Sequence, residues 1–367
     1  MAREPLKNML NETSLREFSL AIRSVYAQFN VSDFMNKTMG DNWDDLELMA
    51  RGRKIAVTLG QFLPSDYGDA IAVIDEAIKV YRGFATFSFT EFVTIYGLSD
   101  ECWDISVAAL GRFTEYFSAE FAVRPFIVKH QSRMMKQMLD WAKSDNDHLR
   151  RLASEGCRPA LPWGVALANF KTDPSPILPI LEILRDDPSF SVRNSVANNL
   201  NDISKIHPDL VLGIARRWYG QSDNTNWIVK HGLRTLLKKS NKGALALFGL
   251  GNADAVKASS FSLDSPYVSL GHYLTFSFTV LAKETTKARL EYAIDFMKAN
   301  GKHNRKVFQI SEISLKENQT KNYIRKHELA DHSTRKHYLG KHFITLIVNG
   351  TAQGTLEFEL TSSPRIS

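Results

Sequence analysis

Three similar phrases recur along the chain, and their spacing constrains the fold more than any other feature. The phrases are LRRLAS (149–154), VRNSVA (192–197) and VKHGLR (229–234), separated by 43 and 37 residues, and each begins with an apolar residue and a cation. Such intervals are typical of HEAT-type helical pairs, in which each pair buries its apolar face against its neighbours. We therefore expect a curved helical solenoid in which Arg150, Arg193 and Lys230 project from one side in a row.

The hydrophobic pattern changes at about residue 250. Before it, apolar residues recur at three- and four-residue spacing, which predicts helices, in 14–29, 45–63, 69–81 and 101–117. After it, apolar and polar residues alternate, which predicts antiparallel strands, in 265–283, 287–300, 305–315, 336–350 and 354–363. The expected fold is mainly α, with a HEAT-like helical-repeat solenoid over residues 1–252. A small all-β immunoglobulin-like sandwich is expected over residues 255–367.

Composition bounds the class of protein and its compartment. The 367 residues are too many for one ordinary core, and 44% of them are hydrophobic, as in a soluble globular protein. Cys102 and Cys157 lack metal-ligand spacing, the N-terminus has no signal-peptide pattern, and no apolar run reaches the roughly 18 residues of a membrane span. We expect a cytoplasmic protein that does not bind membranes.

The positive charge lies in the last third of the chain. Residues 1–254 carry 30 basic and 30 acidic side chains, whereas residues 255–367 carry 16 and 10. The basic residues are densest over 302–341, which we expect to lie in or beside loops. Such a patch is either ordinary solvated surface or the electrostatic footprint of a nucleic-acid partner.

Several long phrases, in order, carry a resemblance to a known family. They are EPLKNMLN, ARGRKIAVTLGQFLP, TEYFSAEFAVRPFI, HLRRLASEGCRPALPWG, DPSPILPILEILRDDPSFSVRNSVANNLNDISKIHPDLV and WIVKHGLRTLLKK. Over about residues 4–250 the chain resembles the AlkC family of DNA alkylation-repair glycosylases, some of which carry a C-terminal Ig-like domain. The resemblance implies monofunctional excision of N3-methyladenine and N3-methylcytosine from double-stranded DNA, without conventional base flipping. We expect a monomer that needs no cofactor and acts at the bacterial nucleoid.

Three acids are candidates for the catalytic carboxylates. A cationic base leaves without protonation, so the enzyme must stabilise the positive charge that develops on the deoxyribose. The family phrase SAEF makes Glu120 the first choice, although pairing with Arg124 is the plain alternative. Glu155 lies at the C-terminal end of a predicted helix, where the helix dipole disfavours an acid, so its presence there suggests a catalytic role. The alternative is a salt bridge to Arg151. Asp202 holds nearly the same place in the next repeat, and its alternative is a helix-end hydrogen bond.

Two tryptophans and a set of cations are candidates for DNA contact. The loop prolines make Trp163 a rigid stacking platform for a cationic base, and Trp227 is a backbone-contact candidate; for both, the alternative is an ordinary core tryptophan. The predicted phosphate clamp, with ordinary surface pairing as the alternative, consists of Arg150, Arg151, Arg158, Arg193 and Lys230. The histidines after residue 326 match no metal-ligand spacing, so no metal site is expected.

Two other functions fit the same residues. The chain could be a non-catalytic DNA-binding HEAT-repeat protein, or a HEAT-type scaffold for other proteins, with its acids serving only as salt-bridge partners. The acids near a row of cations favour catalysis, and the basic C-terminal third favours DNA. We expect the C-terminal domain to close over the duplex as a clamp.

Overall fold

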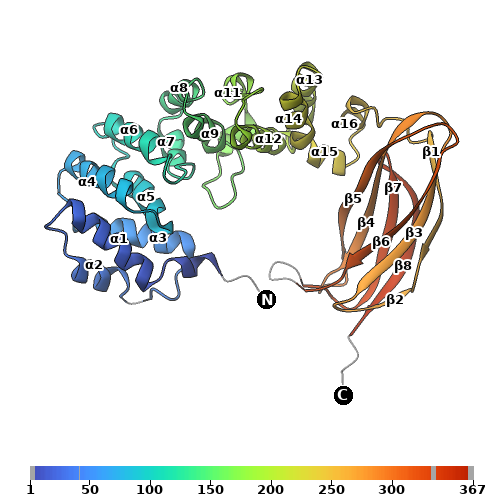
Figure 1. Ribbon diagram of the computed structural model, residues 1–367, viewed down its shortest axis with the longest axis horizontal. Helices are drawn as coiled ribbons and strands as arrows, with labels where there is room; N and C mark the ends of the chain where they lie inside the picture. The colour runs from blue at the N-terminus through green and yellow to red at the C-terminus, as the bar shows by residue number, and fades with distance from the viewer. Residues whose placement is uncertain (1–4, 41, 332–335, 363–367) are drawn as a thin grey trace. The chain divides into compact units, whose positions relative to one another are not determined.

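The computed structural model of the protein describes residues 5–40, 42–331 and 336–362. Helices fill the first two thirds of the chain, and strands begin at Val256 (Figure 1). The helical elements are η1 (Leu6–Met9), α1 (Glu12–Val25), α2 (Val31–Thr38), α3 (Leu48–Leu59), α4 (Tyr67–Val80), η2 (Phe84–Thr86), α5 (Phe87–Tyr96), α6 (Trp103–Phe113), α7 (Val123–Lys129), α8 (Gln131–Trp141), α9 (Asp147–Gly156), α10 (Ala168–Thr172), α11 (Leu178–Ile183), α12 (Phe190–Ser204), α13 (Pro208–Trp218), α14 (Asp223–Gly232), α15 (Arg234–Lys238) and α16 (Lys242–Leu247).

Capping side chains set where several of these helices begin. The Asn11 side chain accepts a hydrogen bond from the Ser14 amide, and the Ser14 hydroxyl accepts one from the Asn11 amide, so the first turn of α1 is capped in both directions. Asp66 caps α4 and Asn146 caps α9 in a similar way. Each of the four expected helical segments corresponds to a helix of the structure: α3 and α6 lie inside their segments, whereas α1 and α4 begin two residues earlier than expected and also end earlier.

The first two repeated phrases lie on helices α9 and α12, and the third begins near the end of α14 and reaches the first residue of α15. Helix α12 packs against α9 on one side and α14 on the other, so the phrases occupy equivalent helices of successive repeats (Figure 1). The approach of α14 to α12 is close, because a Cβ added at Gly232 would lie 3.1 Å from the Leu200 Cβ. Arg150 and Arg193 are each the fourth residue of their helix, as the 43-residue spacing predicts, whereas Lys230 is the eighth residue of α14, so the equivalence predicted from the 37-residue spacing is wrong by one helical turn.

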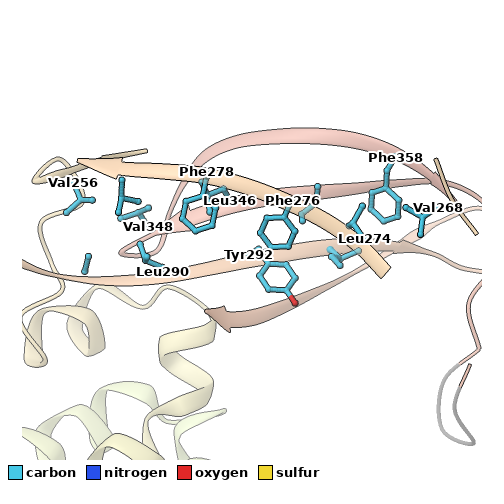
Figure 2. Close-up of a cluster of buried hydrophobic side chains, with 14 of the residues drawn as sticks. Val256, Val268, Leu274, Phe276, Phe278, Leu290, Tyr292, Leu346, Val348 and Phe358 are labelled. Atoms are coloured by element: carbon cyan, nitrogen blue, oxygen red, sulfur yellow. The ribbon is translucent and has the colours of Figure 1, made fainter. Parts of the chain in front are cut away.

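The C-terminal part is a sandwich of two sheets. Strands β1 (Val256–Leu263), β3 (Tyr273–Ala282) and β6 (Thr320–Glu328) form one sheet, in the order β1-β3-β6. The other has the order β2-β8-β7-β4-β5, formed by β2 (Tyr267–Ser269), β8 (Thr351–Thr361), β7 (Gly340–Val348), β4 (Thr286–Met297) and β5 (His303–Leu315). Their inner faces enclose a core that includes Phe276, Phe278, Leu290, Leu346 and Phe358 (Figure 2). The predicted fold class, helical repeats followed by an all-β sandwich, is confirmed.

The prediction that the basic stretch 302–341 lies in or beside loops is wrong for much of its length. All of β5 and all of β6 belong to this stretch, and residues 332–335 lie outside the described residues. The alternation of apolar and polar residues does not reveal β6, because β6 is an edge strand in which only His327 is buried. Lysines and arginines therefore occupy positions that apolar residues hold in an inner strand. The expected strand over 265–283 is two strands, β2 and β3, separated by a turn in which Gly271 has a φ of 89°.

The described chain divides into two compact units. One takes in the described residues up to His207 together with Arg217–Gly232, and the other takes in Pro208–Arg216 and the described residues from Leu233 onward. The second unit therefore joins the sandwich to α15 and α16. The Asn349 side chain donates a hydrogen bond to the Asn252 carbonyl (3.0 Å), which ties the turn between β7 and β8 to the segment after α16. The domain boundary at residues 252–255 remains a prediction.

Candidate active site

Glu120 lies in the turn between α6 and α7, where it is held by two donors. Its Oε2 accepts hydrogen bonds from the Ser118 hydroxyl (2.7 Å) and from Nη2 of Arg151 on α9 (2.8 Å). Arg151 also donates from Nη1 to the Ser118 hydroxyl (2.7 Å), which closes a triangle. The Glu120 side chain keeps 15% of its surface exposed, so a carboxylate of fixed orientation reaches the protein surface.

Glu155 and Asp202 share one arginine, and both are almost fully buried. Arg158 donates from Nη1 to Glu155 (2.6 Å) and from Nε to Asp202 (2.9 Å), while Lys205 donates to the other Asp202 oxygen (2.9 Å). Burial opposes the charge of Arg158, but the two carboxylates outweigh it and raise the pKa of the guanidinium. The expected alternative for Glu155, a salt bridge to Arg151, is not what the structure shows, because Arg151 pairs with Glu120 instead.

Arg124 connects these groups through the main chain. Its guanidinium, fully buried, donates to the carbonyl oxygens of Val165 (2.5 Å), Gly156 (2.9 Å) and Arg158 (2.9 Å), and so fixes both ends of the loop that follows α9. It does not form the ion pair with Glu120 that was the alternative for that acid. Burial lowers the pKa of Arg124 to about 10.

The neighbouring charges show which groups surround Arg124. Arg158 lowers its pKa further, whereas the carboxylates of Asp202 and Glu120 act in the opposite direction. Glu120 accepts a hydrogen bond from Arg151 of α9, and Glu155, which Arg158 binds, lies four residues further along the same helix. Glu120 and the Arg158 cluster therefore belong to one site, built around the loop that Arg124 holds.

Trp163 stands out on that loop. Its side chain is 67% exposed, so the alternative of a core tryptophan does not apply. Its backbone has a φ of 65°, a left-handed conformation that bulky residues rarely adopt and that costs on the order of 1–3 kcal/mol. Strain of this kind persists where the surroundings impose it, and it is concentrated at functional sites. The loop thus presents a flat aromatic ring in a fixed, outward position.

Arg150 and Arg193, equivalent residues of the repeat, make equivalent contacts. Nη1 of Arg150 donates to the carbonyls of Ser144 and Asp145, and Nη1 of Arg193 donates to those of Asp187 and Pro188, in each case the residues six and five positions earlier. Arg150 is also bound by the Asp187 carboxylate (2.6 and 3.1 Å), and this hydrogen bond raises the pKa of the arginine. These arginines hold the loops before their helices, and Arg150 links two repeats.

An exposed aromatic group lies beside Arg193. Phe190, 58% exposed, contacts Trp227 edge to face, with ring centroids 5.1 Å apart, and Trp227 stacks on His231 at 5.0 Å. The guanidinium of Arg193 lies over the Phe190 ring at 5.7 Å, and Lys230 is exposed on the same helix as Trp227. The sequence reasoning missed Phe190 and His231. The four-residue spacing of Trp227 and His231, which places them on one helix face, was the available signal.

The described residues contain no group of three or more histidine, cysteine, aspartate or glutamate side chains that could hold a metal ion. No helix among them is long and apolar enough to span a membrane.

Comparisons with known proteins find relatives of both parts of the chain. The family model "DNA alkylation repair enzyme" matches residues 116–235, and the model "Uncharacterised protein YhaZ, C-terminal Ig-like domain" matches residues 257–362. The chain is 43% identical over 355 residues to a Bacillus subtilis (strain 168) protein described as "Uncharacterized protein YhaZ", which covers 97% of this chain and 99% of that protein.

A solved structure is similar over nearly the whole chain. It is the Pseudomonas fluorescens alkylpurine DNA glycosylase AlkC, bound to DNA containing an abasic site analog. The two share 35% sequence identity with a TM-score of 0.94, and the match covers 98% of this chain and 100% of the other. The protein therefore belongs to the AlkC-like family of DNA alkylation-repair proteins, in which a helical-repeat region precedes a C-terminal Ig-like domain.

Proposed function

We propose that the protein is a monofunctional DNA glycosylase that hydrolyses the N-glycosidic bond of cationic alkylated bases, N3-methyladenine and N3-methylcytosine, in double-stranded DNA. The AlkC structure that it resembles is that of an alkylpurine DNA glycosylase on DNA with an abasic site analog, the state left after a base has been removed. The acids and the exposed tryptophan of the candidate site supply the chemistry that this reaction needs.

Glu120 is the carboxylate that faces the sugar in this proposal. As the bond to a cationic base breaks, positive charge moves onto the deoxyribose, and a fixed carboxylate stabilises it. Ser118 and Arg151 use only Oε2 of Glu120, so Oε1 is left for the sugar or for the attacking water. Glu155 and Asp202, which are buried, do not contact the sugar, but their negative charge adds to the electrostatic field at the sugar. Arg158, which both acids bind, fixes the loop.

Trp163 contacts the lesion. An outward aromatic ring can lie against a base pair from outside the stack, and it attracts a cationic base more than a neutral one. Its exposure supports excision without drawing the base into an enclosed pocket, because a pocket residue would be covered.

The cations bind the flanking phosphates. Arg151 and Lys230 reach the surface. Arg150, Arg158 and Arg193 already donate hydrogen bonds within the protein, so they bind DNA only through N–H groups that those contacts do not use. Phosphate contacts fix position on DNA without reading sequence, as a search for damage requires. Trp227, with Phe190, forms a second surface for the backbone.

The observation that carries the proposal is the convergence of Glu120, bound by Arg151 of α9, and the Glu155–Arg158–Asp202 cluster on the Arg124-held loop that presents Trp163. The test is incubation with methylated duplex DNA in the presence of a chelator, followed by chromatography of the released bases. We expect free N3-methyladenine and N3-methylcytosine. Binding of the duplex without release of any base would leave a non-catalytic DNA-binding protein.

A further inference from the structure

A hollow of about 530 Å³ lies in the second compact unit, between the end of α15 and the five-stranded sheet. Helix α15 and the residues after it form one wall, and β5 with the turn between β7 and β8 forms the other. The lining residues are Thr235, Lys238, Lys239, Ser240, Arg305, Val307, Ile347, Gly350 and Ala352. None of them belongs to the candidate active site.

The charge of this hollow is of one sign. Three of its lining residues are cations, and none is a carboxylate. Lys238 and Lys239 are exposed, and no carboxylate of the described residues forms an ion pair with either. Arg305 is paired with Asp295 (2.9 Å) on the neighbouring strand, so the two lysines supply most of the uncompensated charge.

The two walls are fixed against each other. Gly350 has a φ of 78°, and a Cβ added there would lie 2.7 Å both from the Ser240 Cβ and from Leu245 Cδ1. Ser240 has a φ of 55° and is held by a hydrogen bond from its amide to the Leu237 carbonyl (2.9 Å). The lysines therefore stand beside a preformed concave surface, not on a free tail.

We propose that this hollow binds the phosphate backbone of the DNA on which the protein acts; the proposal rests on the proposed function. Unpaired lysines beside hydroxyl groups bind phosphate as point charges and hydrogen-bond donors. No aromatic residue lines the hollow, so a nucleobase would find no stacking surface there, and a backbone phosphate is the part of DNA that fits. The hollow lies outside the lesion site, so it adds affinity for any DNA sequence.

The test compares two double variants of the full-length protein. The first is Lys238→Gln with Lys239→Gln. The matched control is Lys37→Gln with Lys136→Gln, which removes two exposed lysines from helices α2 and α8. Binding to an undamaged, fluorescently labelled duplex is measured over a range of salt concentrations, and thermal unfolding verifies that both variants are folded.

We expect the plot of log K against log salt to become shallower for the first variant only, by about 0.9 for each phosphate that the protein no longer neutralises. The dissociation constant at about 0.1 M salt should rise on the order of tenfold. Equal slopes for the first variant and the wild type would overturn the proposal, as would the same change in the control, which would reflect overall charge.

Equilibrium dialysis with inorganic phosphate at constant ionic strength separates DNA backbone from a free anion. We expect no saturable phosphate binding. Phosphate binding that the first variant loses, together with an unchanged DNA salt slope, would make this a free-anion site and overturn the proposal. Undamaged DNA is the probe, so a protein that binds it through the hollow but releases no methylated base would disprove the glycosylase function alone.

Discussion

The backbone conformation of Trp163 lowers the stability of the folded protein, and its exposed ring contributes little hydrophobic burial to offset that cost. We expect Trp163→Ala to change the free energy of unfolding by no more than about 0.5 kcal/mol, as for other surface positions. Binding to methylated DNA should weaken by on the order of 1–3 kcal/mol, because no ring is left to stack on the base. Urea denaturation and DNA titration measure the two quantities.

The control for this variant is a tryptophan of the opposite kind. Trp218 is 1% exposed, so Trp218→Ala should destabilise the protein by about 3–5 kcal/mol. If Trp163→Ala costs as much stability as Trp218→Ala, the ring serves packing and the stacking role is wrong.

Glu120→Gln removes a charge but keeps the size of the side chain and an oxygen that can accept from Ser118 and Arg151. We expect the single-turnover rate of base release to fall by at least about tenfold, because the carboxylate no longer stabilises positive charge in the transition state. DNA affinity and thermal stability should be nearly unchanged.

Glu47→Gln is the matched control for Glu120→Gln, since Glu47 is a surface acid that is 81% exposed and pairs with Lys7. Its rate should equal that of the wild type. Full activity of Glu120→Gln would move the role of the sugar-facing acid to Glu155 or Asp202.

At the scale of elements, the pair of Arg150 on α9 and Asp187 before α12 joins successive repeats. The Arg150 side chain is mostly buried in this pair, so Arg150→Ala should lower the free energy of unfolding by about 1–3 kcal/mol. All six tryptophans precede residue 228, so their fluorescence during urea denaturation reports on the helices. Arg193→Ala, which breaks hydrogen bonds only within its own loop, should cost less. Equal losses of stability would argue against the inter-repeat role.

Strand β7 carries a histidine that makes the sandwich sensitive to acid. His342 is fully buried, accepts from the Met297 amide (3.2 Å) and contacts the Tyr338 carbonyl (2.9 Å). Burial lowers its pKa, and the nearby histidines 303 and 337 lower it further. The unfolded chain therefore binds the proton more readily, and the stability present above about pH 6.5 is lost as the pH falls.

Hydrogen exchange of β4 and β7 between neutral and mildly acidic pH measures this loss, since the sandwich has no tryptophan. His342→Gln keeps a donor and an acceptor but does not titrate. Its sandwich should show a shallower dependence on pH than the wild type. An unchanged dependence would assign the effect to other groups.

The elements show why the sequence predicted some features and not others. Alternation located β3, because its buried positions are all apolar, but not β6, whose exposed edge tolerates lysine. The spacing of the repeats predicted the equivalence of Arg150 and Arg193. The spacing could not predict that their partners are carbonyl oxygens. Every residue has a main-chain carbonyl, so no residue type in the sequence indicates which carbonyl accepts the hydrogen bond. The same applies to Arg124, whose three acceptors come from the main chain.

At the scale of the whole molecule, the candidate catalytic acids and the net positive charge lie in different parts of the chain. The candidate acids lie in the first compact unit, whereas the net positive charge belongs to residues 255–367. A glycosylase that does not bury a flipped base gains no binding energy from a pocket, so it depends on the backbone for affinity. The proposed clamp is thus an electrostatic contribution from the C-terminal domain to a reaction carried out in the helical region.

Truncation after Asp254 tests this division. The first compact unit has its own core, so α1 to α12 should keep their protection from hydrogen exchange. Helices α15 and α16 belong to the other unit and lose the turn at Gly350 that packs against Leu245, so they should exchange faster. The truncated chain should bind DNA more weakly, with a salt slope shallower by about 0.9 for each phosphate that it leaves unneutralised, and should release methylated bases more slowly. If binding, salt slope and base release all match those of the full chain, the domain does not clamp DNA, and its charge serves another partner.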